Sequence, residues 1–447
     1  MPFVPHTADD RETMLRRVGV ASVEELFLDV PEARRFPTLE LPPPLSEPEV
    51  LAELAQLAHR NWNLDQHPCF LGAGAYNHFV PSVVKHVLSR GEFYTAYTPY
   101  QPEVSQGTLQ AIFEYQSLIC DLTGMDAANA SHYDGATALA EALIMALSVH
   151  RGRRRKGVIS RTVHPEYRQT ARTYTQGMGL ELTGDEQPGL SLPDLAGIVD
   201  EDTAAVVIQV PDFLGAVPSL DEVRLLADAA HQAGALLVVA VNPISLGLLQ
   251  PPGEYGADIV VGEGQPLGNH LSFGGPYLGF FATRTDHVRR MAGRLVGMTV
   301  DLDGNRGYVL TLATREQHIR RERATSNICT NQALNALAAA VYLAAMGPAG
   351  LRTVASACYH KAHYAASRVG RLTGYDVLSH RFFHEFVVRC PRPPSEVGGA
   401  LLAEGIIPGY DLGEAYPELE GCMLLCVTEL NTREQIDRLV DVLGAPS

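Results

Sequence analysis

The chain has 447 residues, more than a single typical core holds, so we expect two or three structural units. Its 46% hydrophobic and 19% charged residues predict a sizeable folded interior and exclude the disordered and fibrous classes. The formal net charge of −16 argues against general binding to the phosphate backbone of nucleic acids.

The termini and cysteines indicate the compartment. The start, "MPFVPHTADDRETM", has no cationic stretch followed by an apolar one, and we expect neither a secretory signal nor a membrane span. Seven cysteines without framework spacing predict free thiols in a reducing cytoplasm. Cys422 and Cys426 suit a core strand, and His380 and His384 lack a third ligand nearby. We therefore expect no metal site.

Residues 1–75 have the pattern of a helical arm and connector. Thr7 with Asp10, and Ser22 with Glu25, resemble capping arrangements at two helix starts. The prolines of "FPTLELPPPLSEP" (36–48) predict an extended connector, and an amphipathic helix follows over 50–58. We expect this region to wrap another element rather than to form a core of its own.

Strands and helices alternate beyond this arm. Helices are expected over 106–123, 136–150 and 220–233, with short apolar strands beginning near 157, 204, 235 and 258. This alternation predicts a large domain over 76–325, built on a mainly parallel sheet covered on both faces. An Ala-rich helix (331–346), strands near 384–390 and 422–430, and a closing helix (432–443) predict a smaller C-terminal α+β domain over 326–447.

Ligands of open α/β sheets gather beyond the carboxyl ends of the strands. In "SHYDGATALAEAL" (131–143), Asp134 and the next three residues open an Ala-rich helix and expose backbone N–H groups that suit a phosphate. The same pattern caps many helices, and capping is the favoured interpretation.

The segment "GEGQPLGNHLSFGGP" (262–276) follows an apolar strand and precedes another. It resembles the turn that carries the Schiff-base lysine in aminotransferase-like enzymes using pyridoxal phosphate, but Gln265 occupies the expected lysine position. The strand over 235–241 in such enzymes usually carries an aspartate that pairs with the pyridinium nitrogen. Here the matching residue is Ala240, with Asn242 as the nearest polar alternative. Two cofactor anchors are therefore missing together.

Another lysine does not replace the missing one. The chain has only Lys85, Lys156 and Lys361, and none follows a strand before a glycine turn. Lys156 ends a basic run, 151–156, for which a solvated loop is the favoured interpretation over a docking patch for an acidic partner.

Two polar segments are candidates for a ligand site. The loop over 91–107 carries Tyr94, Tyr97 and Tyr100, which suit either an aromatic interface or hydroxyls inserted into a site. The segment "ATSNICTNQAL" (324–334) precedes the long helix, and helix capping explains only some of its polar residues, Thr325, Ser326, Asn327, Thr330 and Asn331. Contact with a phosphate or carboxylate is the alternative for this segment.

Taken in order, these segments resemble the N-terminal subunit of the two-chain bacterial glycine decarboxylase, the P-protein family of the glycine cleavage system. The resemblance runs the whole length, through "FVPHTADDRETMLRRVGVASVEELF", "FLGAGAYNHFVPSVV", "YTAYTPYQPEVSQGTLQAIFEYQ", "GQPLGNHLSFGGPYLGFFATR", "RATSNICTNQAL" and "LLCVTELNT". The combination is specific, whereas any single segment is not.

The resemblance implies an aminotransferase-like fold of type I, the fold of many pyridoxal phosphate enzymes, and a related second subunit that holds pyridoxal phosphate on its own lysine. Together the two subunits would decarboxylate glycine and pass the aminomethyl group to the lipoyl arm of the H-protein. We expect the 94–100 loop to approach the substrate or lipoyl entry and the 325–331 segment to approach the partner's phosphate. A cytoplasmic pair of heterodimers is expected.

Two rival hypotheses stay open. In the first, the chain is an ordinary pyridoxal phosphate enzyme whose lysine is one of the three named above. In the second, it is a structural or regulatory pseudoenzyme that only stabilises a cofactor-bearing partner. The sequence also leaves open a redox role for Cys329, for which a buried thiol is the simpler interpretation.

Overall fold

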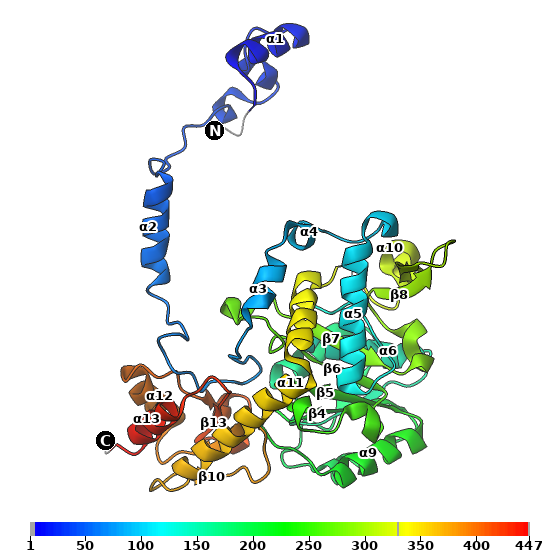
Figure 1. Cartoon of the computed structure of the whole chain (residues 1–447), viewed down its shortest axis with the longest axis vertical. Coiled ribbons are helices and arrows are strands. Elements are labelled where there is room, and N and C mark those ends of the chain that lie inside the picture. Colours follow the sequence, from blue (N-terminus) through cyan, green and yellow to red (C-terminus); the bar gives the residue numbers. More distant parts are fainter. Residues whose placement is uncertain (1–4, 329, 446–447) are drawn as a thin grey trace. The chain divides into compact units, whose positions relative to one another are not determined.

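Figure 1 shows the chain as a computed structural model, which describes residues 5–328 and 330–445. The chain divides into two compact units, Met1–Trp62 and Asn63–Ser447. The boundary falls before the expected residue 75, because residues 63–75 pack with the second unit. Phe70 N donates to Ile407 O at 3.0 Å, and Cys426 N donates to Phe70 O at 2.9 Å.

The first unit contains helices α1 (Ala8–Val18) and α2 (Glu47–Ala58). The predicted capping box of Thr7 and Asp10 opens α1, and Ser46 with Glu49 opens α2 in the same way. The expected helix near Ser22 is only a 3₁₀ turn, Glu24–Phe27. No side chain of α1 or α2, both described throughout, is buried. An apolar helix face with no cover suits contact with another chain.

The second unit is built on a seven-stranded mixed sheet of order β1-β7-β6-β5-β4-β2-β3, in which β7 is antiparallel to both its neighbours and the other pairs are parallel. Its strands are β1 (Ala127–Ala128), β2 (Lys156–Ile159), β3 (Glu181–Thr183), β4 (Thr203–Val210), β5 (Leu236–Val241), β6 (Ile259–Glu263) and β7 (Gly279–Thr283). The mainly parallel sheet agrees with the prediction, since β4 and β5 are the apolar runs that parallel strands require.

Helices cover both faces of this sheet. Val239 and Val241 of β5 pack into a core with α5, α9 and α11, whereas Val238 and Ala240 pack into a core with α6 and α7. The helices of this part are α3 (Ser82–Leu88), α4 (Gly91–Tyr94), α5 (Gln106–Thr123), α6 (Gly135–Val149), α7 (Pro165–Thr175), α8 (Leu192–Gly197), α9 (Leu220–Ala233) and α10 (Gln317–Arg320). A two-stranded hairpin, β8 (Leu295–Val300) with β9 (Arg306–Thr311), flanks α5.

The long helix α11 (Ala333–Val369) leads to the small domain. It kinks at Gly347, whose φ is 59°, immediately before Pro348. Among the described residues it is the one helix long and apolar enough to cross a membrane, contrary to the expectation that no stretch reaches that length. Ala338, Ala339 and Tyr342 are fully buried against the large domain, as in a core helix.

The small domain is the α+β unit that the sequence predicts. Its antiparallel sheet has the order β10-β11-β13-β12, with β10 (Asp376–Val377), β11 (Glu385–Arg389), β12 (Tyr410–Asp411) and β13 (Cys422–Cys426). Helices α12 (Pro394–Ala403) and α13 (Arg433–Leu443) complete it. Cys422 and Cys426 lie buried in β13, as expected for a core strand.

The basic run over 151–156 is not simply a solvated loop. Arg154 Nη1 donates to Thr203 O at 2.9 Å and to Ala233 O at 2.7 Å. Lys156 lies in β2 and pairs with Asp200 at 2.7 Å. The sequence interpretation missed these contacts because backbone carbonyls brought close by the sheet are invisible in a charge pattern.

Candidate functional site

Gln265 lies two residues beyond β6 and is 1% exposed. Its Oε1 accepts from Tyr76 N at 3.0 Å, while its Nε2 donates to Tyr76 O at 3.0 Å and to Asn269 O at 2.7 Å. Both N–H groups of the amide and its oxygen are therefore bound within the chain. At the position where the fold expects a lysine, the side chain is a structural brace.

A carboxylate occupies the helix start that the sequence marked for a phosphate or a cap. Asp134 caps α6 by accepting from Thr137 N at 2.7 Å, as expected. Glu263 Oε2 accepts from Gly135 N at 3.0 Å, and Glu263 Oε1 accepts from Gln265 N at 2.9 Å and Leu278 N at 3.0 Å. Burial raises the pKa of Glu263 to about 8, and the three N–H donors oppose this rise because they favour the ionised form.

The segment 72–76 lies beside Gln265 and binds it through the backbone of Tyr76. Ala73 N donates to Glu385 Oε1 at 2.7 Å, and the Tyr76 hydroxyl donates to Glu385 Oε2 at 2.8 Å. His164 Nε2 lies 3.0 Å from Ala73 O, and a Cβ added to Gly74 would lie 2.5 Å from that nitrogen. Burial raises the pKa of Glu385 to about 7. A loop from the first part of the unit thus joins the large-domain site to β11 of the small domain.

The second expected anchor is also absent. Ala240 is 1% exposed in β5, and its methyl group belongs to the core beneath α6. Asn242 does not replace an aspartate, because its Oδ1 accepts from Ile244 N at 2.9 Å and its Nδ2 lies 3.3 Å from His384 Nε2. Burial lowers the pKa of His384 to about 3, so its ring is neutral.

The fold implies pyridoxal phosphate, and the residues of this chain do not fit that group. There is no amine at position 265, no carboxylate at position 240, and the N-terminal amide of α6 already binds Glu263. Tyr76 of the 72–76 segment binds the side-chain amide of Gln265 from both its N and its O.

The three lysines lie apart from this site. Lys85 is exposed on α3, Lys156 pairs with Asp200, and Lys361 Nζ donates to Glu429 O. None contacts Gln265 or Glu263 among the hydrogen bonds of the described residues, so the structure offers no substitute amine.

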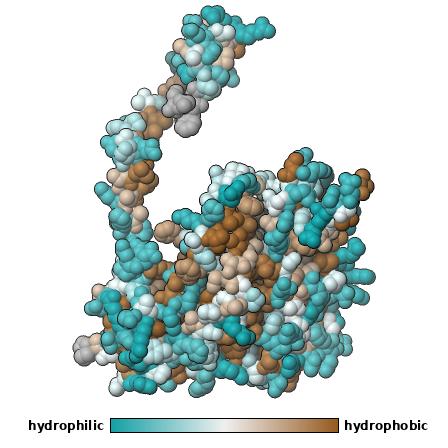
Figure 2. All heavy atoms as spheres, viewed as in Figure 1, coloured by the Kyte–Doolittle hydropathy of each residue, from teal (hydrophilic) through white to brown (hydrophobic). Residues whose placement is uncertain are grey.

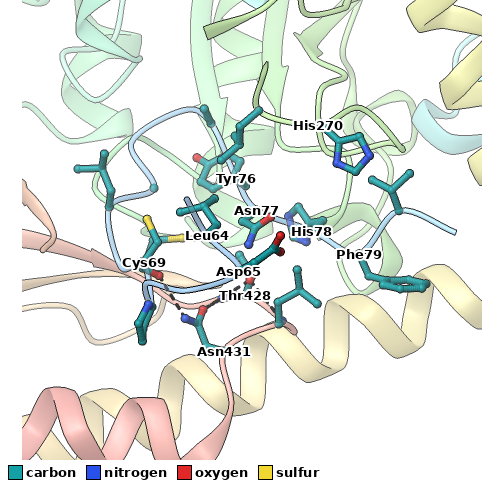
Figure 3. Close-up of a pocket in the computed structure, with 18 of the residues that line it drawn as sticks. Leu64, Asp65, Cys69, Tyr76, Asn77, His78, Phe79, His270, Thr428 and Asn431 are labelled. Carbon is teal, nitrogen blue, oxygen red and sulfur yellow. Dashed lines mark hydrogen bonds between the residues drawn. The ribbon is translucent and has the colours of Figure 1, made fainter. Parts of the chain in front are cut away.

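A cavity of about 600 Å³ lies on the outer side of the 72–80 segment (Figure 3). Tyr76, Asn77 and His78 line it, together with His270 from the loop after Gln265 and Thr428 from the small domain. The cavity is therefore bounded by both domains, next to the filled cofactor position.

Beneath the cavity wall, His78 and Glu429 form a buried ion pair. His78 Nδ1 lies 2.6 Å from Glu429 Oε2, and Phe79 N donates to Glu429 Oε1 at 2.7 Å. Although burial opposes it, the hydrogen bond from His78 and its charge lower the pKa of Glu429 to about 2. With Cys358, whose thiol donates to Glu429 at 3.4 Å, they form a group that could hold a metal ion. The sequence analysis did not single out this trio.

The three tyrosines of the 91–107 loop are exposed. Tyr94, Tyr97 and Tyr100 have 59%, 74% and 52% of their surface accessible, and the segment contains the short helix α4 rather than a loop alone. Tyr94 and Tyr97 line an apolar groove with Leu334 at the start of α11. Apolar side chains gather on this face, over α4, α5 and α11 (Figure 2). An exposed patch of this kind marks a contact surface.

Tyr100 and Asn331 meet at Arg294, a residue that the sequence reading missed. Arg294 is 5% exposed, and its guanidinium donates to Asn331 Oδ1 at 3.4 Å and to the Tyr100 hydroxyl at 3.5 Å. Glu316 lies 3.8 Å from Arg294 Nε, which has no hydrogen-bond partner among the described residues. Asn331 Nδ2 donates to Ser131 Oγ at 2.9 Å.

The other members of the 325–331 segment are spread out. Ser326 Oγ donates to Glu141 Oε1 at 2.6 Å, and burial raises the pKa of Glu141 to about 7. Asn327 is exposed, Thr325 and Thr330 are half-buried, and Cys329 lies outside the described residues. Helix capping does not explain the segment, because the N-cap residue of α11 is Gln332 and no side chain caps it.

The residues that sequence reasoning missed are mostly acceptors and donors from distant segments. Glu263 stands two residues before the lysine position and offered a local signal, as a lone acid ending an apolar strand. No such local signal marked Tyr76, Glu385 or Arg294. The partners of Tyr76 and Glu385 lie more than 180 residues away in the sequence. Arg294 binds Asn331, which lies beyond the β8–β9 hairpin.

Comparisons with known proteins identify the family of the chain. Residues 1–443 match the family described as glycine cleavage system P-protein. A protein of Thermomicrobium roseum named "Probable glycine dehydrogenase (decarboxylating) subunit 1" is 56% identical over 447 residues, 99% of each chain. The crystal structure of a glycine decarboxylase (P-protein) of the glycine cleavage system, in inhibitor-bound form, has a TM-score of 0.89 and 45% identity and covers 99% of both chains.

A more distant structure bears on the fold alone. The sphingosine-1-phosphate lyase of Burkholderia pseudomallei has a TM-score of 0.65 at 16% identity, over 93% of this chain and 94% of that one. Together these likenesses confirm the aminotransferase-like α/β fold of type I that the sequence predicts.

Proposed function

Because this chain belongs to the glycine cleavage system P-protein family, we propose that it is the subunit of glycine dehydrogenase (decarboxylating) that does not anchor the cofactor. A related second subunit holds pyridoxal phosphate on its own lysine. The two subunits together decarboxylate glycine and transfer the aminomethyl group to the lipoyl arm of the H-protein.

The observation that carries this proposal is the bonding of Gln265. An amide cannot form an imine, and all three of its polar contacts are made inside the chain. A side chain used in this way has no role in holding a cofactor covalently. The name "subunit 1" of the 56% identical relative supports the existence of a second chain.

The chain contributes surface to a site shared with its partner. Tyr94 and Tyr97 present large amphipathic side chains on an apolar groove, the composition that contact surfaces favour. Thr325 and Asn327, with Tyr100 on the neighbouring loop, present polar groups toward the substrate entry and the partner's cofactor.

Arg294 is a buried cation beneath this shared surface, and Glu316 lies 3.8 Å from its Nε. Its guanidinium lies between Tyr100 and Asn331, with one N–H free of any described acceptor. Guanidinium groups suit phosphate and carboxylate oxygens, and the cluster is thus compatible with an anionic group supplied by the partner or by glycine. Two such heterodimers assemble in the cytoplasm as a heterotetramer.

The first test uses the isolated chain. It is incubated with pyridoxal phosphate, reduced with borohydride and examined by absorbance and peptide mass. The proposal expects no site-specific label on the chain, and glycine decarboxylation only after the second subunit is added. Stoichiometric label on Lys85, Lys156 or Lys361 would show that this chain is itself the cofactor-binding enzyme.

A scaffold that only stabilises its partner is the second candidate, and the internally filled cofactor position favours it. Tyr97→Phe and Asn327→Ala in the assembled enzyme separate the two, with Tyr174→Phe on α7 as the control. If the site is shared, these two variants should lower glycine turnover or weaken cofactor retention while assembly stays intact. Unchanged turnover and cofactor affinity in both variants would support the scaffold hypothesis.

A further inference from the structure

We propose that the cofactor position of this chain is closed from within by the carboxylate of Glu263 and by residues 72–76, so that returning a lysine to position 265 does not return pyridoxal phosphate binding. The inference deepens the proposed function and rests on its premise that the partner holds the cofactor. It adds that cofactor binding is lost not only through the missing amine at position 265 but also through the residues packed around that position.

Glu263 stands where an oxyanion would bind. The first amide of α6 is a donor at the positive end of a 15-residue helix, and Glu263 Oε2 accepts from it at 3.0 Å. The other carboxylate oxygen accepts from Gln265 N and Leu278 N. Because the carboxylate is tethered to β6, its effective concentration exceeds that of any phosphate in solution. Above its pKa of about 8, its negative charge also repels a phosphate.

The geometry selects an anion rather than any polar filler. Three backbone N–H groups approach Glu263 from two sides, and each needs an acceptor. A glutamine at this position would turn its NH₂ group against at least one of these donors. Only a carboxylate offers acceptors at both ends.

Residues 72–76 lie against Gln265, whose backbone N binds Glu263. Gly72, Ala73 and Gly74 are all left-handed, with φ of 55°, 58° and 110°, which sets a fixed path for the loop. Ala73 is bound on both sides, to Glu385 and to His164, and Tyr76 pairs with Gln265. A lysine at position 265 would therefore lose three hydrogen bonds and have to displace Tyr76 before reaching any cofactor.

The first experiment is a chemical rescue of Glu263→Ala. Acetate supplies the carboxylate and the carbon that this substitution deletes. We expect a lowered Tm for the variant at pH 8.5 and a saturable rise of about 1 to 3 °C with acetate, measured against chloride at equal ionic strength. The wild-type chain, whose site is filled, shows no saturable rise.

Glu141→Ala is the matched control. Glu141 is also a buried glutamate, 5% exposed and on α6, but it accepts from Ser326 instead of the helix start. Its truncation should not be rescued by acetate. An undiminished Tm for Glu263→Ala, no acetate effect on it, or equal rescue of Glu141→Ala would each overturn the role of Glu263.

The second experiment tests the closed space directly and does not depend on Glu263→Ala folding. Gln265→Lys is incubated with pyridoxal phosphate, reduced with borohydride and mapped by peptide mass, after cooperative thermal unfolding has shown that it is folded. We expect no label at position 265. Near-stoichiometric label there, with the wild-type chain unlabelled, overturns this inference alone, whereas label on the wild-type chain overturns the proposed function. If Gln265→Lys does not unfold cooperatively, the acetate rescue of Glu263→Ala decides the inference.

Discussion

The side-chain amide of Gln265 and the backbone of Tyr76 bind each other in both directions, with Oε1 accepting from N and Nε2 donating to O, each at 3.0 Å. This pairing joins positions 189 residues apart in the sequence. An amide side chain is neutral and can accept and donate through two different atoms, so it suits a backbone segment that needs both. The residue that replaces the expected lysine thus has a structural role of its own.

Gln265→Leu should be strongly destabilising. Leucine has a similar size but leaves Tyr76 N, Tyr76 O and Asn269 O without a partner in a buried site, and each unsatisfied group costs about 1–3 kcal/mol. Denaturant unfolding should show a loss of about 3 kcal/mol or more. Gln250→Leu is the control, because the one side-chain hydrogen bond of Gln250 among the described residues is to Glu254 at the surface. A change of less than about 0.5 kcal/mol is expected for it. Equal losses of unfolding free energy in the two variants would contradict the structural role of Gln265.

Tyr76→Phe should remove one hydrogen bond from Glu385 and lower the free energy of unfolding by about 1–2 kcal/mol. Tyr115→Phe is a close control, because Tyr115 is fully buried and its hydroxyl has no partner among the described residues. The control should be neutral or slightly stabilising. The two variants are compared by urea unfolding at one pH, and a cost for Tyr115→Phe as large as that for Tyr76→Phe would refute the assignment.

Gly135→Ala should destabilise the start of α6. A Cβ at this position would lie 2.2 Å from the Tyr167 hydroxyl oxygen and 2.9 Å from Glu263 N, closer than atoms can approach. Overpacking of this kind costs about 1–3 kcal/mol. Gly399→Ala, in the exposed middle of α12 with nothing within 4 Å, should instead stabilise by about 0.5–1 kcal/mol. Opposite signs in denaturant unfolding are the expected result, and a tolerated alanine at 135 would mean that the site is open.

Glu429→Gln should weaken the fold more above pH 4.5 than at acid pH. The pKa of Glu429 is about 2 in the folded protein against an ordinary value of 4.5, so the ion pair contributes above pH 4.5 and is lost as the pH falls toward 2. Breaking this buried pair costs about 3–5 kcal/mol.

Thermal unfolding at several values between pH 3 and pH 7 measures this dependence. The difference in Tm between the wild-type chain and Glu429→Gln should shrink as the pH drops below 4.5. Glu92→Gln, which breaks an exposed pair with Arg90, serves as the control with little expected effect. A pH-independent difference would show that the pair does not titrate as described.

Much of the fold could be predicted because local patterns determine it. The helices over 106–123 and 220–233 have the observed bounds, and the apolar runs at 204 and 235 are β4 and β5. Periodicity and capping act over a few residues, and they therefore survive in a single sequence. The prediction of a helix near Ser22 was wrong, because its capping pair precedes only a 3₁₀ turn.

Of the site, only the absence of the two cofactor anchors could be predicted from the sequence. Gln265 and Ala240 could be read directly as missing anchors, because each is a matter of residue type at one position. The roles of Tyr94, Tyr97 and Asn327 stay predictions, since their partners would lie on another chain.

What the sequence by itself determined is therefore the alternation of elements and the absence of a cofactor lysine. The tertiary structure alone decided what replaces the cofactor. Glu263 reaches the start of α6 across 128 positions, and Glu385 reaches Tyr76 across 309. Hydrogen bonds between such distant residues depend on where the whole chain packs, and no short-range pattern records them.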